Sequence, residues 1–383
     1  MRMQNRKYRL FISAADPSAD AHCAGLITAL KQSGCDFEFI GVGGSKMAAA
    51  GCELLEVTVG RSVMMYKAFA QVAHFYKLVK RIEAFLKSNR VDLVVVCDSP
   101  SFNWHVAKAA KRLHIKTMFY VAPQLWAWAG WRINKLRKYC DKLCCILPFE
   151  EAWFSRRGVD TTFVGNPLLD VLPADLSRYR KDYRVFDCKN LKLAMMPGSR
   201  TAEIESLWPA MQQIALQLKQ KYPGAAFTAV AADHQKRDLL MKTHIPGFEC
   251  DYSVDSVQDS AARADFALVA SGSATLEVAS AGCPMVVMYQ TSRVLWHLVG
   301  RWLVRPKHFC LVNLLADRRL VPEFMPYFSS IMPIVETVDR LLRDTTELKR
   351  ISDGLINLAE PLTEKKARDE TAKIIVDMLH HGF

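Results

Sequence analysis

The chain lacks the features that mark secreted, membrane-spanning and zinc-binding proteins. Residues 1–9 are basic and polar, without the apolar core of about 7–15 residues that a signal peptide needs. No apolar run approaches the length of about 18 residues that a membrane-spanning helix requires. The 11 cysteines are odd in number and contain no matched pair of C-x2-C motifs, which argues against a disulfide framework and against zinc. We therefore expect a cytoplasmic, reduced protein without a metal site.

A dinucleotide-binding fingerprint is also missing. Residues 41–46 read Gly-Val-Gly-Gly-Ser-Lys, so the sixth position of G-x-G-x-x-G is occupied by Lys46. This departure disfavours a Rossmann dehydrogenase, and we interpret the glycines as a tight turn lining a ligand crevice. No nucleic-acid recognition module is present either. The formal charge of +12 and the pI of about 9.2 then favour a phosphorylated substrate or an acidic lipid surface over nucleic acid.

What the chain does contain is a regular alternation of strands and helices. A length of 383 residues, half of them hydrophobic, favours two domains with separate cores. Short apolar strands between helices predict an α/β fold of two doubly wound, Rossmann-like domains facing across a cleft. We expect an N-terminal domain over residues 1–168, a C-terminal domain over 169–360, and a helical tail over 361–383 that braces the domains or a dimer. Expected strands cover residues 9–14, 37–42, 93–97, 117–121, 143–147, 162–164, 193–196, 226–231, 266–270 and 285–289.

Two loops in the second half have the composition of phosphate-binding loops. Ser271, Gly272 and Ser273 lie between an apolar strand and a predicted helix, where small residues and free N–H groups suit an anion. Glu277, further into that helix, is placed to accept hydrogen bonds from sugar hydroxyls. In the second loop, Ser199 and Arg200 follow another strand, and a guanidinium there suits a diphosphate. Together the loops indicate a nucleotide-sugar site, although each alone fits an ordinary turn equally well.

The first half supplies polar groups that we expect on the acceptor side. Asp98 directly follows the apolar strand 93–97, where it is placed to act as a general base. A helix cap or turn is an equally simple role for it. Ser18 and Asp20 follow the first strand and serve either as N-caps or as ligands of the acceptor. We group Asn103, close behind Asp98, with the acceptor-binding residues.

Two segments combine large apolar side chains with basic residues, a composition that suits a helix at an anionic membrane surface. The first contains Met64, Met65, Tyr66 and Phe69, and the second contains Trp296 and Trp302. Packing of these helices on their own domain is the alternative. The tryptophans at 126, 128 and 131 are interpreted as local core, with a binding platform as the alternative.

In the order of its motifs the chain resembles the lipid-A-disaccharide synthases, glycosyltransferases of the two-domain B-type fold. The motifs run nearly end to end: Asp98-x-Pro100-x-Phe102-Asn103, Tyr120-Val121-x-Pro123-Gln124-x-Trp126-Ala127-Trp128, Pro148-Phe149-Glu150, Val164-Gly165-x-Pro167-Leu168, Pro197-Gly198-Ser199-Arg200-x-x-Glu203, Ser271-Gly272-x-x-x-Leu276-Glu277, Asn313 and Pro322-Glu323.

This resemblance implies transfer of 2,3-diacylglucosamine from its UDP donor to 2,3-diacylglucosamine 1-phosphate, forming a β-1,6 disaccharide in lipid A biosynthesis. It also implies inversion at the anomeric carbon without a cofactor and work at the cytoplasmic face of the inner membrane as a peripheral protein. Members of the family often form a homodimer. On this basis Asp98 and Arg200 are the expected catalytic residues, and Asn313 and Glu323 join the donor-binding set.

Several positions depart from the family pattern, mostly on the acceptor side. Residues 15–20 read Ala-Asp-Pro-Ser-Ala-Asp where the family has Gly-Glu-x-Ser-Gly-Asp, and Ser101 and Asn166 replace an aspartate and a histidine. Met65, Ala68 and Met325 replace a glycine, a glutamate and a glutamine. The alternative is thus a divergent paralogue, either a B-type glycosyltransferase with another acceptor or a non-catalytic protein that binds UDP-sugar or membrane.

Overall fold

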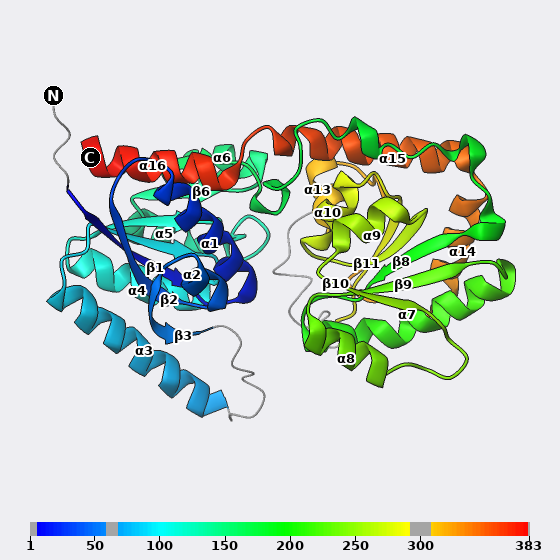
Figure 1. Ribbon diagram of the computed structural model, residues 1–383, viewed down its shortest axis with the longest axis horizontal. Coiled ribbons are helices and arrows are strands. Elements are labelled where there is room, and N and C mark those ends of the chain that lie inside the picture. Colours follow the sequence, from blue (N-terminus) through cyan, green and yellow to red (C-terminus); the bar gives the residue numbers. More distant parts are fainter. Residues whose placement is uncertain (1–5, 59–67, 292–307, 382–383) are drawn as a thin grey trace. The chain divides into compact units, whose positions relative to one another are not determined.

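A computed structural model describes residues 6–58, 68–291 and 308–381 of the chain (Figure 1). The chain divides into two compact units. Unit 1 comprises Met1–Asp170 and Lys365–Phe383, and unit 2 comprises Val171–Glu364. The C-terminal segment, which we set apart at residue 361, is thus counted with unit 1 from Lys365 onward.

Unit 1 is built on a fully parallel sheet of seven strands in the order β3-β2-β1-β4-β5-β6-β7. The central strands are runs of aliphatic residues buried on both faces, as a parallel sheet covered by helices requires. The strands are β1 (Tyr8–Ala14), β2 (Phe37–Gly43), β3 (Glu53–Val57), β4 (Leu93–Cys97), β5 (Lys116–Tyr120), β6 (Lys142–Cys145) and β7 (Thr161–Phe163).

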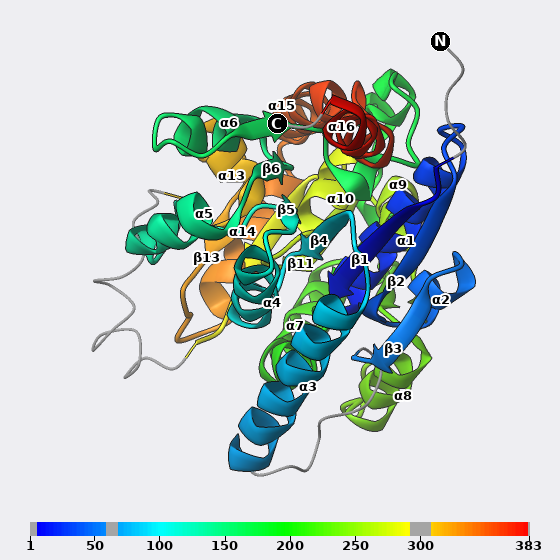
Figure 2. The same cartoon turned by 90° about the vertical axis from the view of Figure 1, so that its left-hand side faces the viewer.

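Helices cover both faces of this sheet (Figure 2), and each face has its own hydrophobic core. Leu10, Ile12 and Ala14 of β1 pack on the side of α1 and α16, whereas Phe11 packs on the side of α3 and α4. Alternate residues of one strand therefore serve opposite faces. The helices are α1 (Pro17–Lys31), α2 (Ser45–Ala49), α3 (Ala68–Ser88), α4 (Pro100–Arg112), α5 (Ile133–Tyr139), α6 (Pro148–Ser155) and α16 (Ala367–His381).

Unit 2 repeats the design with a parallel sheet of six strands in the order β10-β9-β8-β11-β12-β13. In Figure 1, α7 and α8 lie on one side of this sheet and α9 and α10 on the other. The strands are β8 (Lys192–Met196), β9 (Ala226–Ala231), β10 (Asp251–Val254), β11 (Phe266–Ala270), β12 (Met285–Met288) and β13 (Glu323–Phe324). The helices are α7 (Thr201–Lys221), α8 (His234–Lys242), α9 (Val257–Arg263), α10 (Ala274–Ser280), α13 (Leu311–Ala316), α14 (Met332–Leu342) and α15 (Thr345–Ala359).

The predicted α/β class with two doubly wound units is confirmed, and every expected strand is present within a few residues. Three strands were missed: β3, β10 and β13. The interpretation of the tryptophan cluster as local core is wrong for Trp128 and Trp131, which are 44% and 65% exposed. Both follow β5, in a stretch that forms a loop and a single 3-10 turn rather than an element with a buried face.

The segments that we assigned to a membrane surface lie largely outside the described residues. Met64, Met65, Tyr66, Trp296 and Trp302 belong to residues 59–67 and 292–307, and Phe69 lies at the start of α3, where side chains are not described. Within the described part of the chain, no helix is long and apolar enough to cross a membrane.

Candidate active site

Each sheet has one point at which the strand order reverses, and the predicted site residues follow the strands at these points. In unit 1 the reversal lies between the neighbouring strands β1 and β4, and in unit 2 between β8 and β11. Open α/β sheets bind ligands beyond the carboxyl ends of such strands, because the adjoining loops diverge there and leave a crevice. The loops after β1 and β4, and those after β8 and β11, therefore form the candidate site of each unit.

The loop after β1 is organised by Asp16. Its Oδ1 accepts hydrogen bonds from the backbone N–H of Ala19 (2.8 Å) and from Ser18 Oγ (2.7 Å), so Asp16 caps α1. Its Oδ2 accepts a hydrogen bond from Ser99 Oγ in the loop after β4. Burial raises the pKa of Asp16, but these hydrogen bonds outweigh it and lower the pKa overall. Asp16 thus joins the two loops as an anion.

The neighbouring imidazole is uncharged at neutral pH. His22 lies one turn into α1 behind Asp16. Burial lowers the pKa of His22 to about 4, and the attraction of the Asp16 carboxylate only partly offsets this effect. The negative charge of Asp16 is therefore balanced by hydrogen bonds rather than by an imidazolium ion.

Asp98 lies at the carboxyl end of β4 in a strained backbone conformation. Asp98 and Ser99 have positive φ angles of 46° and 41°, a region that residues with a Cβ adopt at a cost of about 1–3 kcal/mol each. Helix α4 begins directly afterwards, with Ser99 as its N-cap residue. The backbone N–H of Asp98 donates to the carbonyl of Tyr120 at the end of β5, 3.1 Å away. Asp98 is half-buried.

The side chain of Asn103 in α4 holds this turn through hydrogen bonds to its backbone. Its Nδ2 donates to the carbonyl oxygens of Cys97 (2.9 Å) and Asp98 (2.7 Å), while its Oδ1 accepts from Ser13 Oγ of β1 (2.7 Å). The side chain is fully buried. A side chain so enclosed and so fully engaged has no free group for a ligand. The expectation that Asn103 binds the acceptor is therefore corrected: it positions Asp98.

Asp20 is corrected for the same reason. It is 3% exposed, and its carboxylate accepts hydrogen bonds from the backbone N–H groups of Gly44 (2.8 Å), Lys46 (3.1 Å) and Met47 (3.1 Å). These bonds tie α1 to the start of α2 and shape the glycine turn after β2. Of the three expected acceptor-binding residues, only Ser18 is exposed.

A further carboxylate, that of Glu150, lies in the first turn of α6. Glu150 accepts hydrogen bonds from Trp126 Nε1 (2.9 Å) and from the backbone N–H groups of Ile146 (3.2 Å) and Leu147 (3.1 Å). It is 1% exposed. Burial raises the pKa of Glu150 to about 7, against these hydrogen bonds, and the charge of Asp98 raises it slightly further. Glu150 therefore anchors the loop after β5 to the start of α6.

In unit 2, the loop after β8 is closed by a capping box at the start of α7. Glu203 Oε2 accepts from the backbone N–H groups of Ser199 (3.1 Å) and Arg200 (3.2 Å). Gly198 has φ of 110°, and a Cβ atom there would lie 2.6 Å from Glu203 Oε2. The Arg200 guanidinium is 82% exposed and pairs with Glu203 Oε1 at 2.7 Å. Because this pair is exposed, it holds Arg200 weakly and leaves it available to an anion.

The loop after β11 and the helix that follows it present hydrogen-bond donors and an acceptor that have no partner among the described residues. Gly272 and Ser273 are exposed, and their backbone N–H groups have no hydrogen-bond acceptor in the described part of the chain. The Glu277 carboxylate, within the first turn of α10, has no hydrogen-bond or ion-pair partner among the described residues. Burial raises the pKa of Glu277 to about 7, and the charge of Asp255 adds to this effect. A partly buried carboxylate without a donor is a ready acceptor for ligand hydroxyls.

The two donor-binding residues taken from the family resemblance have other contacts. Asn313 is fully buried, and its amide donates to Val321 O (2.8 Å) and accepts from the N–H groups of Leu320 (2.8 Å) and Val321 (2.9 Å). Its expected contact with the donor is corrected to a positioning role. Glu323 Oε2 accepts from Cys310 N at 3.0 Å, and this bond fixes the residues that lead into α13.

Sequence reasoning missed Asp16, Ser99 and Glu150. Asp16 carries a recognisable signal, because an aspartate followed by proline is typical of an N-cap and the first helical position. Ser99 and Glu150 carry none that a single sequence reveals, since their partners are 83 and 24 residues away. No group of three His, Cys, Asp or Glu side chains suited to a metal ion occurs among the described residues.

The two parallel sheets and their strand order define the fold class of this protein. Solved structures with low sequence identity share the fold over nearly the whole chain. UDP-GlcNAc 2-epimerase from Neisseria meningitidis, bound to UDP-GlcNAc, has a TM-score of 0.61 at 11% identity, covering 98% of this chain and 100% of the other. MurG from Acinetobacter baumannii has a TM-score of 0.57 at 14% identity, covering 97% and 100%. The protein has the B-type glycosyltransferase fold.

Sequence comparison identifies the family within this class. The profile of the lipid-A-disaccharide synthetase family matches residues 10–375. The lipid-A-disaccharide synthase of Geobacter metallireducens is 32% identical over 378 residues, covering 97% of both chains. The chain belongs to the lipid-A-disaccharide synthetase family. The resemblance, the fold class and the prediction of a glycosyltransferase of lipid A biosynthesis are therefore confirmed.

Proposed function

We propose that the protein transfers 2,3-diacylglucosamine from its UDP donor to the 6-hydroxyl of 2,3-diacylglucosamine 1-phosphate, forming a β-1,6 disaccharide. The binding of the UDP donor is supported above all by one observation. The Glu277 carboxylate has no partner among the described residues and follows the exposed loop of Gly272 and Ser273. This arrangement suits a nucleotide, whose ribose offers two hydroxyl donors to one carboxylate.

Arg200 and the loop after β11 would bind the diphosphate. Arg200 follows β8 and Ser273 follows β11, and these two strands are hydrogen-bonded neighbours. A guanidinium beside unpartnered backbone N–H groups suits phosphate oxygens. As the bond to the sugar breaks, negative charge grows on the diphosphate, and preorganised donors stabilise that charge in the transition state.

Asp98 would be the general base of a single in-line displacement. The acceptor 6-oxygen forms a bond to the anomeric carbon while the bond from that carbon to the diphosphate oxygen breaks, which inverts the configuration. The proton of the hydroxyl passes to the Asp98 carboxylate, and UDP leaves as the anion. The strained turn at Asp98 and Ser99 supports this role, because strain of this kind persists where a side chain must point in one functional direction.

The loops of unit 1 that we assign to the acceptor differ from the family pattern at Asp16, Ser101 and Asn166. Asp16 replaces the glutamate of the family pattern, and it reaches Ser18, Ala19 and Ser99 within its own loops. Ser101 is exposed in the first turn of α4, and Asn166 is buried and accepts from the N–H of Leu168 at 3.1 Å. Ser18 is thus the residue that we propose to contact the acceptor.

The lipid substrates suggest that the protein works at the cytoplasmic face of the inner membrane as a peripheral protein. Trp128 and Trp131 support this proposal, because they are exposed aromatic side chains in a basic stretch, with the Arg132 guanidinium 5.1 Å from the Trp128 ring. Amphipathic aromatic rings beside cationic groups suit an anionic headgroup layer. The segments around Tyr66 and Trp302 and a homodimer remain predictions.

Crystals soaked with UDP test the donor assignment. We expect the diphosphate beside Arg200 and Ser273 and the ribose beside Glu277. UDP bound only to unit 1, or the absence of bound UDP at millimolar concentration, would overturn the assignment.

A further inference from the structure

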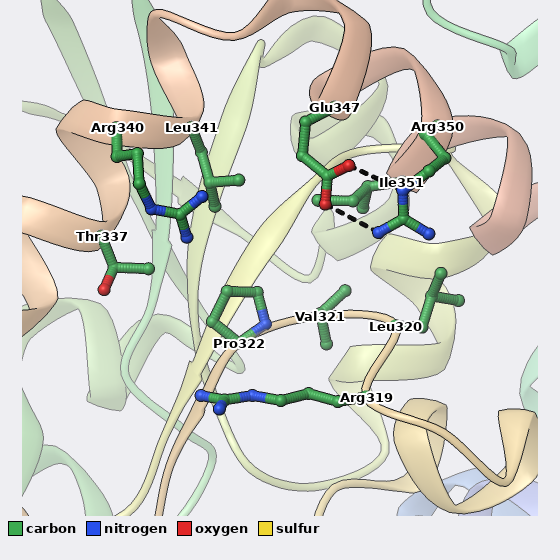
Figure 3. Close-up of a pocket in the computed structure, with 10 residues that line it drawn as sticks. All are labelled: Arg319, Leu320, Val321, Pro322, Thr337, Arg340, Leu341, Glu347, Arg350 and Ile351. Atoms are coloured by element: carbon green, nitrogen blue, oxygen red, sulfur yellow. Dashed lines mark hydrogen bonds and ion pairs between the residues drawn. The ribbon is translucent and has the colours of Figure 1, made fainter.

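Unit 2 contains a cavity of about 350 Å³ that the proposed reaction does not use (Figure 3). Its lining comes from the segment before β13 and from the helices α14 and α15. The lining residues are Arg319, Leu320, Val321, Pro322, Thr337, Arg340, Leu341, Glu347, Arg350 and Ile351. The volume lies at the low end of the range of about 300–1,000 Å³ that is typical of ligand pockets, so a small ligand or a head group fits it.

The polar lining is strongly basic. Arg319, Arg340 and Arg350 come from three different elements and surround the cavity (Figure 3). Neither Arg319 nor Arg340 has a hydrogen-bond or ion-pair partner for its guanidinium among the described residues. Glu347 is a counterion for Arg350 and, at longer range, for Arg340. Three guanidinium groups and one carboxylate still leave a net charge of +2 at the cavity, and an excess of positive charge attracts an anion.

The other two charged residues of the cavity, Arg350 and Glu347, form an ion pair with each other. Arg350 makes a two-point contact with Glu347, in which Nε donates to Oε2 (2.6 Å) and Nη2 donates to Oε1 (2.7 Å). Glu347 lowers the conformational freedom of Arg350, whose Nη1 has no hydrogen-bond partner among the described residues. The cavity is also lined by Leu320, Val321, Leu341 and Ile351, but these side chains are buried and the exposed lining is mainly polar. A mainly polar and basic lining suits a small anion.

This cavity is separate from the candidate active site. Arg319 and Pro322 precede β13, which runs parallel to β12 and begins at Glu323. The cavity therefore lies at the amino ends of the strands of this sheet. Arg200, Ser273 and Glu277 follow the carboxyl ends of β8 and β11 in the same parallel sheet. The two sites therefore lie beyond opposite ends of the strands of this sheet.

We propose that the arginine cavity of unit 2 is a second anion site that binds a phosphate monoester. Planar guanidinium groups match phosphate oxygens in pairs, and a dianionic monoester neutralises the net charge of +2. The monoester has two possible sources, a soluble phosphate compound or the head group of a phospholipid, and they share the same recognition chemistry.

Calorimetry with inorganic phosphate as the probe tests the site in the full-length protein. The double variant Arg319→Ala/Arg340→Ala removes the two unpartnered guanidinium groups. Because each charge-assisted contact contributes about tenfold in affinity, we expect binding to weaken about 100-fold. The matched control is Arg318→Ala/Arg343→Ala, which removes two arginines next to the site that do not line it. The control should bind phosphate like the unchanged protein.

Two further variants separate this site from the donor site. Arg200→Ala should keep the phosphate binding that Arg319→Ala/Arg340→Ala loses. Glu347→Gln should tighten phosphate binding several-fold, because it raises the net charge of the cavity and releases Arg350. Equal binding by the unchanged protein and by Arg319→Ala/Arg340→Ala, with both folded by circular dichroism, would overturn the proposal. Loss of the binding in Arg200→Ala alone would also overturn it.

Vesicle flotation distinguishes the two sources of the phosphate group. Phosphatidylcholine vesicles are compared with vesicles that contain phosphatidic acid, whose head group is a phosphate monoester. If Arg319→Ala/Arg340→Ala reduces flotation with phosphatidic acid several-fold more than Arg318→Ala/Arg343→Ala does, the site serves a lipid head group. Equal flotation of the two variants, together with the loss of phosphate binding, assigns the site to a soluble compound.

Discussion

Ser13 Oγ donates a hydrogen bond of 2.7 Å to Asn103 Oδ1, and this bond joins β1 to α4 beneath the switch point of unit 1. Through its Nδ2 the same amide holds the carbonyl groups of Cys97 and Asp98. The strained turn that presents Asp98 therefore depends on a buried network with partners in two neighbouring strands. The network connects the packing of the sheet to the position of the proposed base.

Replacing Asn103 should damage both stability and turnover. Asn103→Ala removes the hydrogen bonds to the Ser13 hydroxyl and to the carbonyl groups of Cys97 and Asp98, and each buried polar group left unsatisfied costs about 1–3 kcal/mol. We expect a loss of at least about 2 kcal/mol in the free energy of unfolding, measured by urea denaturation. Ser13→Ala removes only one hydrogen bond and should cost less. Equal stability of Asn103→Ala and the unchanged protein would contradict this account of the turn.

Asp98→Asn should lower turnover without unfolding the protein. An amide keeps the size of the side chain but does not accept the proton of the attacking hydroxyl. General-base catalysis contributes about 10²–10⁴ in rate, so we expect a fall in kcat of that size with little change in melting temperature. Asp160→Asn, which removes an exposed carboxylate of the same unit, is the control. Near-normal kcat in folded Asp98→Asn would exclude the base role.

Arg200→Ala should weaken the binding of UDP. Loss of one charge-assisted contact to the diphosphate should reduce the affinity about tenfold or more, and the rise in melting temperature at fixed UDP concentration should shrink accordingly. The control is Arg184→Ala, because Arg184 is likewise an exposed arginine paired with a nearby carboxylate, that of Asp182. If UDP protects Arg200→Ala and Arg184→Ala equally against heat, the diphosphate contacts another group.

UDP binding should depend on the ionisation of Glu277. Its pKa is raised to about 7, so below that pH the carboxyl is mostly protonated and accepts ribose hydroxyls poorly. Affinity should rise from pH 6 to pH 8, and Glu277→Gln should remove this rise. Titration of the UDP phosphates is the same for both proteins and cancels in their difference. Parallel pH profiles for the two proteins would show that Glu277 does not bind the ribose.

The same group should affect stability with the opposite sign. A carboxyl whose pKa is raised in the folded state stabilises the protein below its ordinary pKa of 4.5, and this contribution is lost as the pH rises toward 7. Without ligand, Glu277→Gln should therefore gain stability relative to the unchanged protein between pH 5 and 7, measured by urea denaturation. A difference that does not vary with pH would show that burial does not raise this pKa.

The sequence predicts the sheets of this protein well and the side-chain networks poorly. Strands such as Leu93–Cys97 and Phe266–Ala270 are continuous aliphatic runs, and burial on both faces of a parallel sheet demands that pattern. The edge strands β3, β10 and β13 were missed because an edge strand needs little hydrophobic burial. Their residues are polar in part and mostly half-buried.

The site residues likewise fall into those that a local sequence pattern indicates and those whose contacts form only on folding. The structure places Asp98, Arg200 and Glu277 in the loop or first helical turn after a strand, as their offset from each predicted strand indicated, and their roles in the reaction stay predictions. Asn103 and Asn313 were misjudged, because whether a buried amide faces a ligand or the backbone depends on partners that folding brings together. No local pattern distinguishes these two uses of the same side chain.

The most direct test of the central claim is the product of the purified protein. UDP-2,3-diacylglucosamine and 2,3-diacylglucosamine 1-phosphate are incubated with it, and both products are quantified by mass spectrometry. The account predicts one tetraacyl disaccharide 1-phosphate for each UDP released. Release of UDP without the disaccharide, or no product although UDP binds, would contradict it.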